Sequence, residues 1–189
     1  MARTPSTMVA LGTIAPSFIL PDTITGKQVS LDDIKGEPDS YRVATVVMFI
    51  CNHCPFVKHV NFELVKLANE YKSKGISFVA ISANDAKNYP DDAPDKMKET
   101  AQRLHYPFPY LYDETQQVAK AYDAACTPDF FIYNKNMELV YRGQLDDARP
   151  GNEIPVTGKD IRHALDCLIN NQPVPAAQRP SIGCNIKWK

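Results

Sequence analysis

The sequence has no long apolar run, no excess of charge of one sign and few cysteines. Its longest strongly apolar stretch, Val43 to Cys51, is far shorter than the roughly 20 residues that a helix needs to cross a bilayer. The net charge of the 189 residues is -1, and no cluster of lysine and arginine is present that would neutralise a row of phosphates. We therefore expect neither a membrane span nor a nucleic-acid partner.

Signals for export are also lacking. The stretch from Met1 to Ala10 contains no apolar run of about 7 to 15 residues and no small-residue cleavage pattern, which a signal peptide needs. The cysteines number five, and because only two of them have motif spacing, a structural disulfide framework is not indicated. A reducing, cytoplasmic environment is the location that we predict.

The composition is that of one globular domain. Apolar residues make up 44% of the chain and charged residues 23%, so enough apolar surface is available for a core. The chain has no internal repeat, and its length fits a single domain. We predict one domain over residues 1–189, with its core over about 10–171 and a C-terminal tail over 172–189.

A strand, a helix and a second strand are predicted in the first half. Residues 43–50 form a continuous run rich in β-branched residues, typical of a strand buried on both faces of a sheet. Apolar residues then recur at spacings of three and four, which predicts an amphipathic helix: Val57, Val60, Leu64, Leu67 and Tyr71. Residues 76–81 are a second buried-type strand, which predicts a parallel βαβ unit. The first strand thus delivers Cys51 to a helix N-terminus.

The other segments complete an α/β fold. Extended runs at 17–20 and 28–31 predict an N-terminal β-hairpin, and those at 130–133 and 138–141 predict another that makes the sheet mixed. Further helices are expected at 96–104, at 114–122, and after a capping box at 157–160, where the apolar face is Ile161, Ala164, Leu165 and Leu168. The sequence predicts a central mixed β-sheet flanked by helices.

The chemistry is predicted to lie in the segment Cys51-Asn52-His53-Cys54. A Cys-x-x-Cys between a buried strand and a helix is typical of a redox motif. At a helix N-terminus, backbone N–H groups and the helix dipole stabilise a thiolate, so we expect Cys51 to be the nucleophile. Cys54, one turn further, is expected to be more buried and to resolve a mixed disulfide. His53 is expected to stabilise negative charge on Cys51.

Two other interpretations of the pair remain open at this point. The two cysteines are small apolar residues that would also suit a buried core. They are soft metal ligands as well, with His53, His59 and Cys126 as further candidates. Because no second Cys-x-x-Cys and no histidine pair has zinc spacing, we predict no metal ion and no cofactor.

Most of the chain resembles the thioredoxin superfamily, and within it the branch related to alkyl hydroperoxide reductase and thiol-specific antioxidant proteins. The motifs that carry the resemblance are Ala15-Pro16-Ser17-Phe18-Ile19-Leu20 with residues 27–31, Ile50-Cys51-Asn52-His53-Cys54-Pro55, Ser82-Ala83-Asn84-Asp85 and Thr127-Pro128-Asp129-Phe130-Phe131-Ile132. Segments 143–147, 149–152 and 180–189 are also similar to that branch. The resemblance implies a thioredoxin-like fold.

The resemblance also implies where a substrate binds. It implies that the Thr127–Pro128 peptide bond is cis and faces the cysteines, leaving the Thr127 backbone free to pair with an extended substrate. We expect Asn52, Cys126, Thr127 and Pro128 to contact the substrate, although Cys126 equally suits a packing role. In the tail, we expect Trp188 to anchor the segment; Cys184 is a candidate extra redox partner, and Cys167 is expected to be structural.

These observations favour a thiol-disulfide oxidoreductase that acts on a protein or small-thiol disulfide and is reset by an unknown reductant. One alternative is an antioxidant thiol peroxidase, in which one cysteine becomes a sulfenic acid. The peroxidatic pattern Pro-x-x-x-Thr-x-x-Cys is not matched, because alignment on Cys54 places Val47 at the proline and Cys51 at the threonine. The other alternative is a soft-metal-binding module. Nothing in the sequence fixes the oligomeric state.

Overall fold

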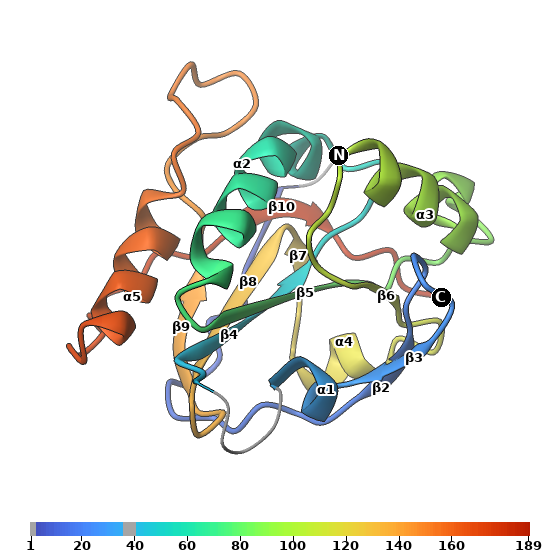
Figure 1. Cartoon of the computed structure of the whole chain (residues 1–189). Helices are drawn as coiled ribbons and strands as arrows, with labels where there is room; N and C mark the ends of the chain where they lie inside the picture. Colours follow the sequence, from blue (N-terminus) through green and yellow to red (C-terminus); the bar gives the residue numbers. More distant parts are fainter. Residues whose placement is uncertain (1–2, 36–40) are drawn as a thin grey trace.

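A five-stranded mixed sheet forms the centre of the computed structural model, which describes residues 3–35 and 41–189 (Figure 1). Its strands are β4 (Ala44–Phe49), β5 (Ile76–Ser82), β6 (Tyr110–Tyr112), β8 (Asp129–Asn134) and β9 (Leu139–Gly143). The order is β6-β5-β4-β8-β9, in which β4, β5 and β6 are parallel and β8 is antiparallel to both of its neighbours. The predicted mixed α/β sheet is confirmed.

Met1 and Ala2, the start of the stretch without an export signal, lie outside the described residues.

Strand β4 is buried along its whole length because both faces of the sheet are covered. Val46 and Met48 point into one hydrophobic core, and Val47 and Phe49 point into the other. This alternation is the period-two pattern of a strand, with apolar residues on both sides. The central position predicted for this strand is confirmed.

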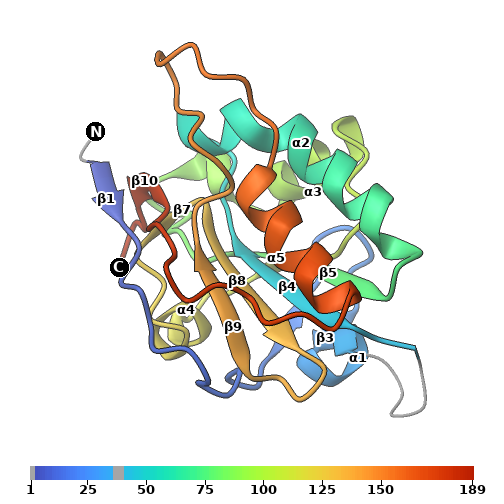
Figure 2. The same cartoon turned by 90° about the vertical axis from the view of Figure 1, so that its left-hand side faces the viewer.

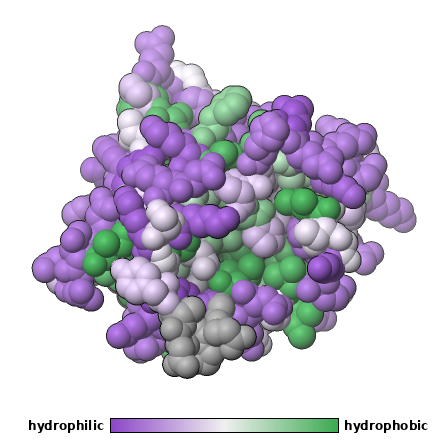
Figure 3. Space-filling model, viewed as in Figure 1, coloured by the Kyte–Doolittle hydropathy of each residue, from purple (hydrophilic) through white to green (hydrophobic). Residues whose placement is uncertain are grey.

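Helices cover both faces of the sheet (Figures 1 and 2). One face packs against three helices: α2 (Pro55–Lys72), α3 (Pro94–Arg103) and α5 (Lys159–Ile169). The other face packs against two short helices and the N-terminal hairpin: α1 (Leu31–Lys35), α4 (Gln117–Ala121), β2 (Ile19–Pro21) and β3 (Gln28–Ser30). In the described ranges, no helix combines the length and apolarity that a membrane crossing requires. The surface in Figure 3 is mostly hydrophilic, with separate small apolar patches.

The predicted apolar stripe of α2 is confirmed, because each of its five members is buried: Val57, Val60, Leu64, Leu67 and Tyr71. Helix α2 ends at Lys72, and Gly75 then adopts a φ of +76°. A left-handed conformation costs glycine little, so the chain turns there into β5. The predicted parallel βαβ unit is therefore present, and its first crossover runs through α2.

The start of α5 differs from the expected capping box. The N-cap is Gly158, and no side chain of the helix caps it. Instead, the buried carboxylate of Asp146 accepts the N–H groups of Thr157 and Gly158, both at 2.7 Å. The Asp160 carboxylate accepts a hydrogen bond from Gln144 at 2.7 Å. The predicted box is wrong because Asp160 bonds to Gln144, and the carboxylate of Asp146 from the preceding loop holds the backbone that leads into the helix.

Helix α4 is shorter than the predicted helix over 114–122. Gln116 has a left-handed φ of +63°, which a continuous α-helix does not tolerate. The Asp113 carboxylate accepts the N–H of Ala119 at 2.8 Å and holds the turn that precedes the helix.

Residues 90–92, in a segment without a predicted element, form the short helix η1 (Pro90–Asp92).

The two ends of the chain meet in a small second sheet (Figure 2). Its strands are β1 (Arg3–Pro5), β10 (Ile182–Asn185) and β7 (Cys126–Thr127), with antiparallel β10 in the middle. Residues 172–189 are thus partly structured rather than a plain tail. The expected anchor Trp188 is 42% exposed, whereas Ile186 is 1% exposed and belongs to the core. Ile186 replaces Trp188 as the anchor because it, and not the larger indole, faces the sheet.

Candidate active site

The Cys-x-x-Cys segment lies in the loop that joins β4 to α2. The helix begins at Pro55, where the missing N–H of proline costs little, and its N-cap is Cys54. This corrects the expectation that Cys51 occupies the helix N-terminus. Asn52 and His53 precede the helix, and their backbone N–H groups both donate to Asp92 Oδ1, at 2.8 and 3.1 Å.

Three sulfur atoms gather beside Thr127. Cys51 Sγ lies 3.4 Å from Thr127 Oγ1, and Cys54 Sγ lies 3.2 Å from the Thr127 carbonyl oxygen. Cys54 Sγ also lies 2.9 Å from Cys184 Sγ. Cys51 is 2% exposed and Cys54 is fully buried, the order of burial expected from the sequence. Thr127 therefore faces the cysteines, and the peptide bond between Thr127 and Pro128 is cis.

Hydrogen bonding within the reduced pair favours the negative charge on Cys54. The pKa of Cys54 is lowered to about 4, first because Cys51 donates a hydrogen bond to its sulfur, and then because Cys184, Thr127 and the N–H of Val57 add their own. The pKa of Cys51 is raised, because it is the donor in that bond, because it is buried, and because Asp92 is close. A thiolate on Cys51 remains a prediction. Cys54 occupies the N-cap, so the positive end of the helix dipole lies nearer to Cys54 than the sequence suggested.

Asp92, on η1, organises the loop and was not predicted. Its Oδ2 lies 2.5 Å from His53 Nδ1 and accepts Asn84 Nδ2 at 2.8 Å, in addition to the two backbone donors at Oδ1. Asn52 is held on its other side, where Tyr110 Oη donates to Asn52 Oδ1 at 3.1 Å. No local pattern marks Asp92, since two of its partners, Asn52 and His53, lie 40 and 39 residues earlier in the chain. Its place in a Pro-rich segment was its one distinguishing feature in the sequence.

The nearest partner of His53 is Asp92, and an effect of His53 on the charge of Cys51 remains a prediction. The hydrogen bond to Asp92 raises the pKa of His53, and the imidazole stacks on Tyr89 with ring centroids 5.5 Å apart. One ligand atom each from Cys51, His53 and Asp92 would fit around a metal ion, since the three lie within 4.8 Å of one another. However, Asp92 already accepts N–H donors at both oxygens, so an ion would have to displace them.

The backbone of Thr127 pairs within the chain itself. Thr127 is opposite Cys184 in the β7–β10 pairing, so the segment that we expected to meet a substrate is occupied by the C-terminal strand. Gly183 permits this close approach, because a Cβ there would lie 2.0 Å from the Thr127 carbonyl oxygen. A contact between Thr127 and a substrate remains a prediction.

The remaining two cysteines lie apart from the sulfur cluster. Cys126 is fully buried, with its Sγ 3.6 Å from the Pro128 carbonyl oxygen, and burial raises its pKa. Cys126 is the first residue of β7, and its side chain is enclosed by the protein, so it presents no surface to a partner in this structure. Cys167 is half-buried on α5, where its Sγ lies 3.9 Å from His163 Nε2 of the same helix.

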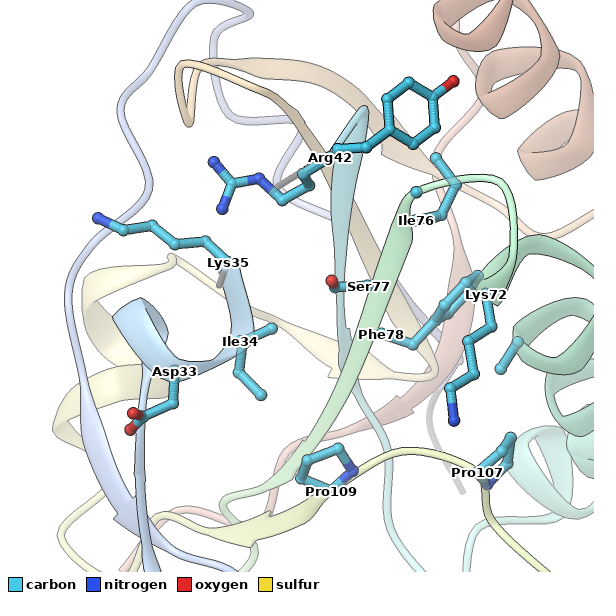
Figure 4. A pocket seen from close by; sticks show the side chains of 13 residues that line it. Asp33, Ile34, Lys35, Arg42, Lys72, Ile76, Ser77, Phe78, Pro107 and Pro109 are labelled. Carbon is cyan, nitrogen blue, oxygen red and sulfur yellow. The ribbon is translucent and has the colours of Figure 1, made fainter. Parts of the chain in front are cut away.

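A cavity of about 320 Å³ lies at the opposite end of the sheet from the cysteines (Figure 4). Its lining includes the start of β5 at Ile76 and the end of α2 at Lys72, whereas Cys54 precedes the first turn of α2. Lys35 and Arg42 lie around it in Figure 4. The cavity is therefore not part of the cysteine site.

Comparisons with known proteins show the family of the chain. The model of the AhpC/TSA family matches residues 11–142. A crystal structure of an uncharacterized conserved protein from Geobacillus kaustophilus is 61% identical, covers 100% of this chain and 97% of its own, and superposes with a TM-score of 0.96. The thiol-disulfide oxidoreductase ResA of G. kaustophilus is 26% identical over 72% of this chain and 70% of its own length.

The fold has wider relatives as well. The solution structure of a putative thioredoxin from Neisseria meningitidis covers 83% of this chain and 90% of its own, at 24% identity and a TM-score of 0.61. At that identity the likeness shows the fold, which is thioredoxin-like as predicted. Since the family model spans well over half of the residues, the chain belongs to the AhpC/TSA family of thioredoxin-like oxidoreductases.

Proposed function

We propose that this protein is a thiol-disulfide oxidoreductase in which Cys51 attacks the disulfide of a partner and Cys54 resolves the mixed disulfide. The observation that carries the proposal is the gathering of both sulfurs at Thr127, at the junction of β4 and α2: Cys51 Sγ lies 3.4 Å from Thr127 Oγ1 and Cys54 Sγ lies 3.2 Å from the Thr127 carbonyl oxygen. The ResA name of the curated relative supports the reaction class. Cys51 is the attacking group because Cys54 is enclosed by Cys184 and the Thr127 carbonyl.

The first step begins when Cys51 passes its proton to Cys54 and becomes a thiolate, the reactive form of cysteine. The Cys51 thiolate attacks one sulfur of the partner's disulfide. A bond forms between Cys51 and that sulfur, the partner's own S–S bond breaks, and the departing thiolate takes the proton from Cys54. The product is a mixed disulfide between the protein and the partner.

The second step uses Cys54, which is a thiolate again. It attacks Cys51 Sγ, the bond to the partner breaks, and the partner's second sulfur leaves as a thiolate. Because Cys54 has already given its proton to the departing thiolate in the first step, the second step requires no external base. A separate reductant would restore the Cys51 and Cys54 thiols.

The partner is proposed to be a protein or a small thiol in its disulfide form, and a cytoplasmic location remains a prediction. No specific observation favours the peroxidase or the metal-binding module. The peroxidatic sequence pattern is unmatched, and the donor atoms nearest to Cys51 are already hydrogen-bonded.

Trapping of the mixed disulfide tests the assignment of the two cysteines. A Cys54→Ser variant, incubated with a peptide that contains one disulfide, should accumulate a covalent adduct at Cys51, found by mass mapping. The matched Cys51→Ser variant should accumulate no adduct at Cys54 with the same peptide. If the adduct instead forms at Cys54 in the Cys51→Ser variant, and not at Cys51, the two roles are reversed.

A further inference from the structure

Cys184 brings a third sulfur to the pair from 130 residues further along the chain. Its Sγ lies 2.9 Å from Cys54 Sγ, and the side chain is 1% exposed. A cysteine that serves only as a small apolar residue is stabilised by burial alone and does not require contact with another sulfur. The contact places Cys54 between two possible sulfur partners.

The backbone around Cys184 holds this sulfur in place. Strand β10 pairs on one side with β1, where Cys184 is opposite Arg3, and on the other with β7, where it is opposite Thr127. Gly183 lets β10 approach the Thr127 carbonyl more closely than any residue with a Cβ would allow. Beyond Cys184, the Lys187 N–H donates to Asn84 Oδ1 at 2.8 Å, and Ile186 is buried. The strand is thus fixed before and after the cysteine.

Building on the function proposed above, we infer that Cys184 is a second resolving cysteine, which exchanges into the Cys51–Cys54 disulfide. Cys184 Sγ attacks Cys54 Sγ, a Cys54–Cys184 bond forms, and the Cys51–Cys54 bond breaks. The proton of Cys184 passes to the departing Cys51 sulfur, so the exchange consumes no oxidant or reductant. The oxidised protein then holds its disulfide between two buried sulfurs while Cys51 is a thiol again.

The charge distribution favours this exchange only in the oxidised protein. In the reduced protein, burial and then the neighbouring Cys54 raise the pKa of Cys184 to about 12, so Cys184 is a thiol that donates to Cys54. Once Cys54 is part of a disulfide it bears no charge, so it no longer raises the pKa of Cys184. The Lys187 ammonium group acts in the opposite sense and favours a Cys184 thiolate.

Disulfide mapping in the full-length chain tests the inference. All proteins carry Cys167→Ser, which removes a half-buried thiol that would otherwise join two molecules. We would equilibrate this parent, its Cys51→Ser variant and the Cys51→Ser/Cys184→Ser variant in graded reduced and oxidised glutathione, alkylate the thiols and map the peptides. The Cys51→Ser variant should form the Cys54–Cys184 disulfide, and the double variant should form none. The parent should be a mixture of molecules, some with Cys51–Cys54 and others with Cys54–Cys184.

The outcomes separate this inference from the proposed function. If the parent forms Cys51–Cys54 but Cys54 and Cys184 stay alkylatable in Cys51→Ser, the inference is wrong and the proposed function stands. If the parent never forms Cys51–Cys54, the proposed function fails and the exchange step fails with it. A time course of the parent, quenched in acid, needs no substitution at the site; Cys54–Cys184 must appear there after Cys51–Cys54, and its absence contradicts the exchange.

Discussion

A single buried carboxylate, that of Asp92, fixes the loop of the cysteine pair. It accepts the N–H groups of Asn52 and His53 and the side chains of His53 and Asn84. Burial works to raise the pKa of Asp92, but the hydrogen bonds from His53 and Asn84 outweigh it and lower the pKa. Asp92 therefore stays ionised next to Cys51, and its hydrogen bond to His53 raises the pKa of that imidazole. The loop geometry and the local charge both depend on this residue.

Substitution of Asp92 by Asn should lower the free energy of unfolding by about 2 kcal/mol, since hydrogen bonds to a charged group are lost. The loss should depend on pH. Asp92 has a lowered pKa, so its contribution to the free energy of unfolding is lost as the pH falls below about 4. His53 has a raised pKa, so its contribution is lost as the pH rises above about 6.5 and through the pKa of His53 in the folded protein. Urea denaturation across this range measures it.

The exposed neighbour Asp91 provides the matched control for that experiment. Its side chain lies in solvent, so Asp91→Asn should change stability by less than about 0.5 kcal/mol at every pH. NMR titration should also show a lower His53 pKa in Asp92→Asn than in the wild type. An unchanged His53 pKa would refute the assigned pairing.

The charge on Cys54 is a second prediction at the scale of residues. The reduced protein should carry one thiolate from the pair at neutral pH, and its ultraviolet absorbance should disappear as the pH falls through about 4. Because the two sulfurs share protons, this value belongs to the pair. Cys54→Ser should lack the low-pH step. A wild-type step near 8.5, the value of an ordinary thiol, would contradict the hydrogen bonding described for the reduced state.

At the scale of elements, periodicity predicted the strands and helices but not their ends. The spacing of Val57, Val60 and Leu64 suffices to predict α2, because a repeating apolar stripe is a local property. The starts of α4 and α5 depend instead on Asp113 and Asp146, whose carboxylates accept backbone N–H groups from beyond their own segments. Such contacts have no sequence period, so the predicted capping box was wrong.

Asp146→Ala should therefore destabilise the protein by about 2 kcal/mol, since it leaves the N–H groups of Thr157 and Gly158 at the start of α5 without their acceptor. The midpoint of denaturant unfolding measures this change. Glu99→Gln, which removes an exposed ion pair with Lys96, is a suitable control and should cost less than about 1 kcal/mol. Equal effects of the two substitutions would show that Asp146 does not cap α5.

At the scale of the whole molecule, the C-terminal strand was the feature least accessible from the sequence. The Cys-x-x-Cys motif, the central strand and the mixed sheet follow from local patterns, and the thioredoxin-like fold follows from the resemblance. The pairing of β10 with β1 and β7 joins segments that are far apart in the chain, and β10 is only four residues long. That pairing places Cys184 in the site, a position that residue spacing alone does not reveal.

The anchor of this strand gives a prediction for the whole molecule. Ile186→Ala should cost about 2 to 4 kcal/mol, because the isoleucine is buried in the core. Trp188→Ala should cost less than about 1 kcal/mol, because much of the indole remains in solvent. Hydrogen exchange should show faster exchange at β10 in the first variant only. A larger loss in Trp188→Ala would restore the tryptophan as the anchor.

The central claim is that Cys51 and Cys54 form a reversible redox couple. The direct measurement is equilibration of the protein in graded reduced and oxidised dithiothreitol, followed by alkylation and disulfide mapping. The account predicts a Cys51–Cys54 disulfide with a midpoint between about -270 and -180 mV, the range from thioredoxin to protein disulfide isomerase. Two cysteines that remain unpaired at every ratio, or a Cys54 that pairs with Cys126, would contradict it.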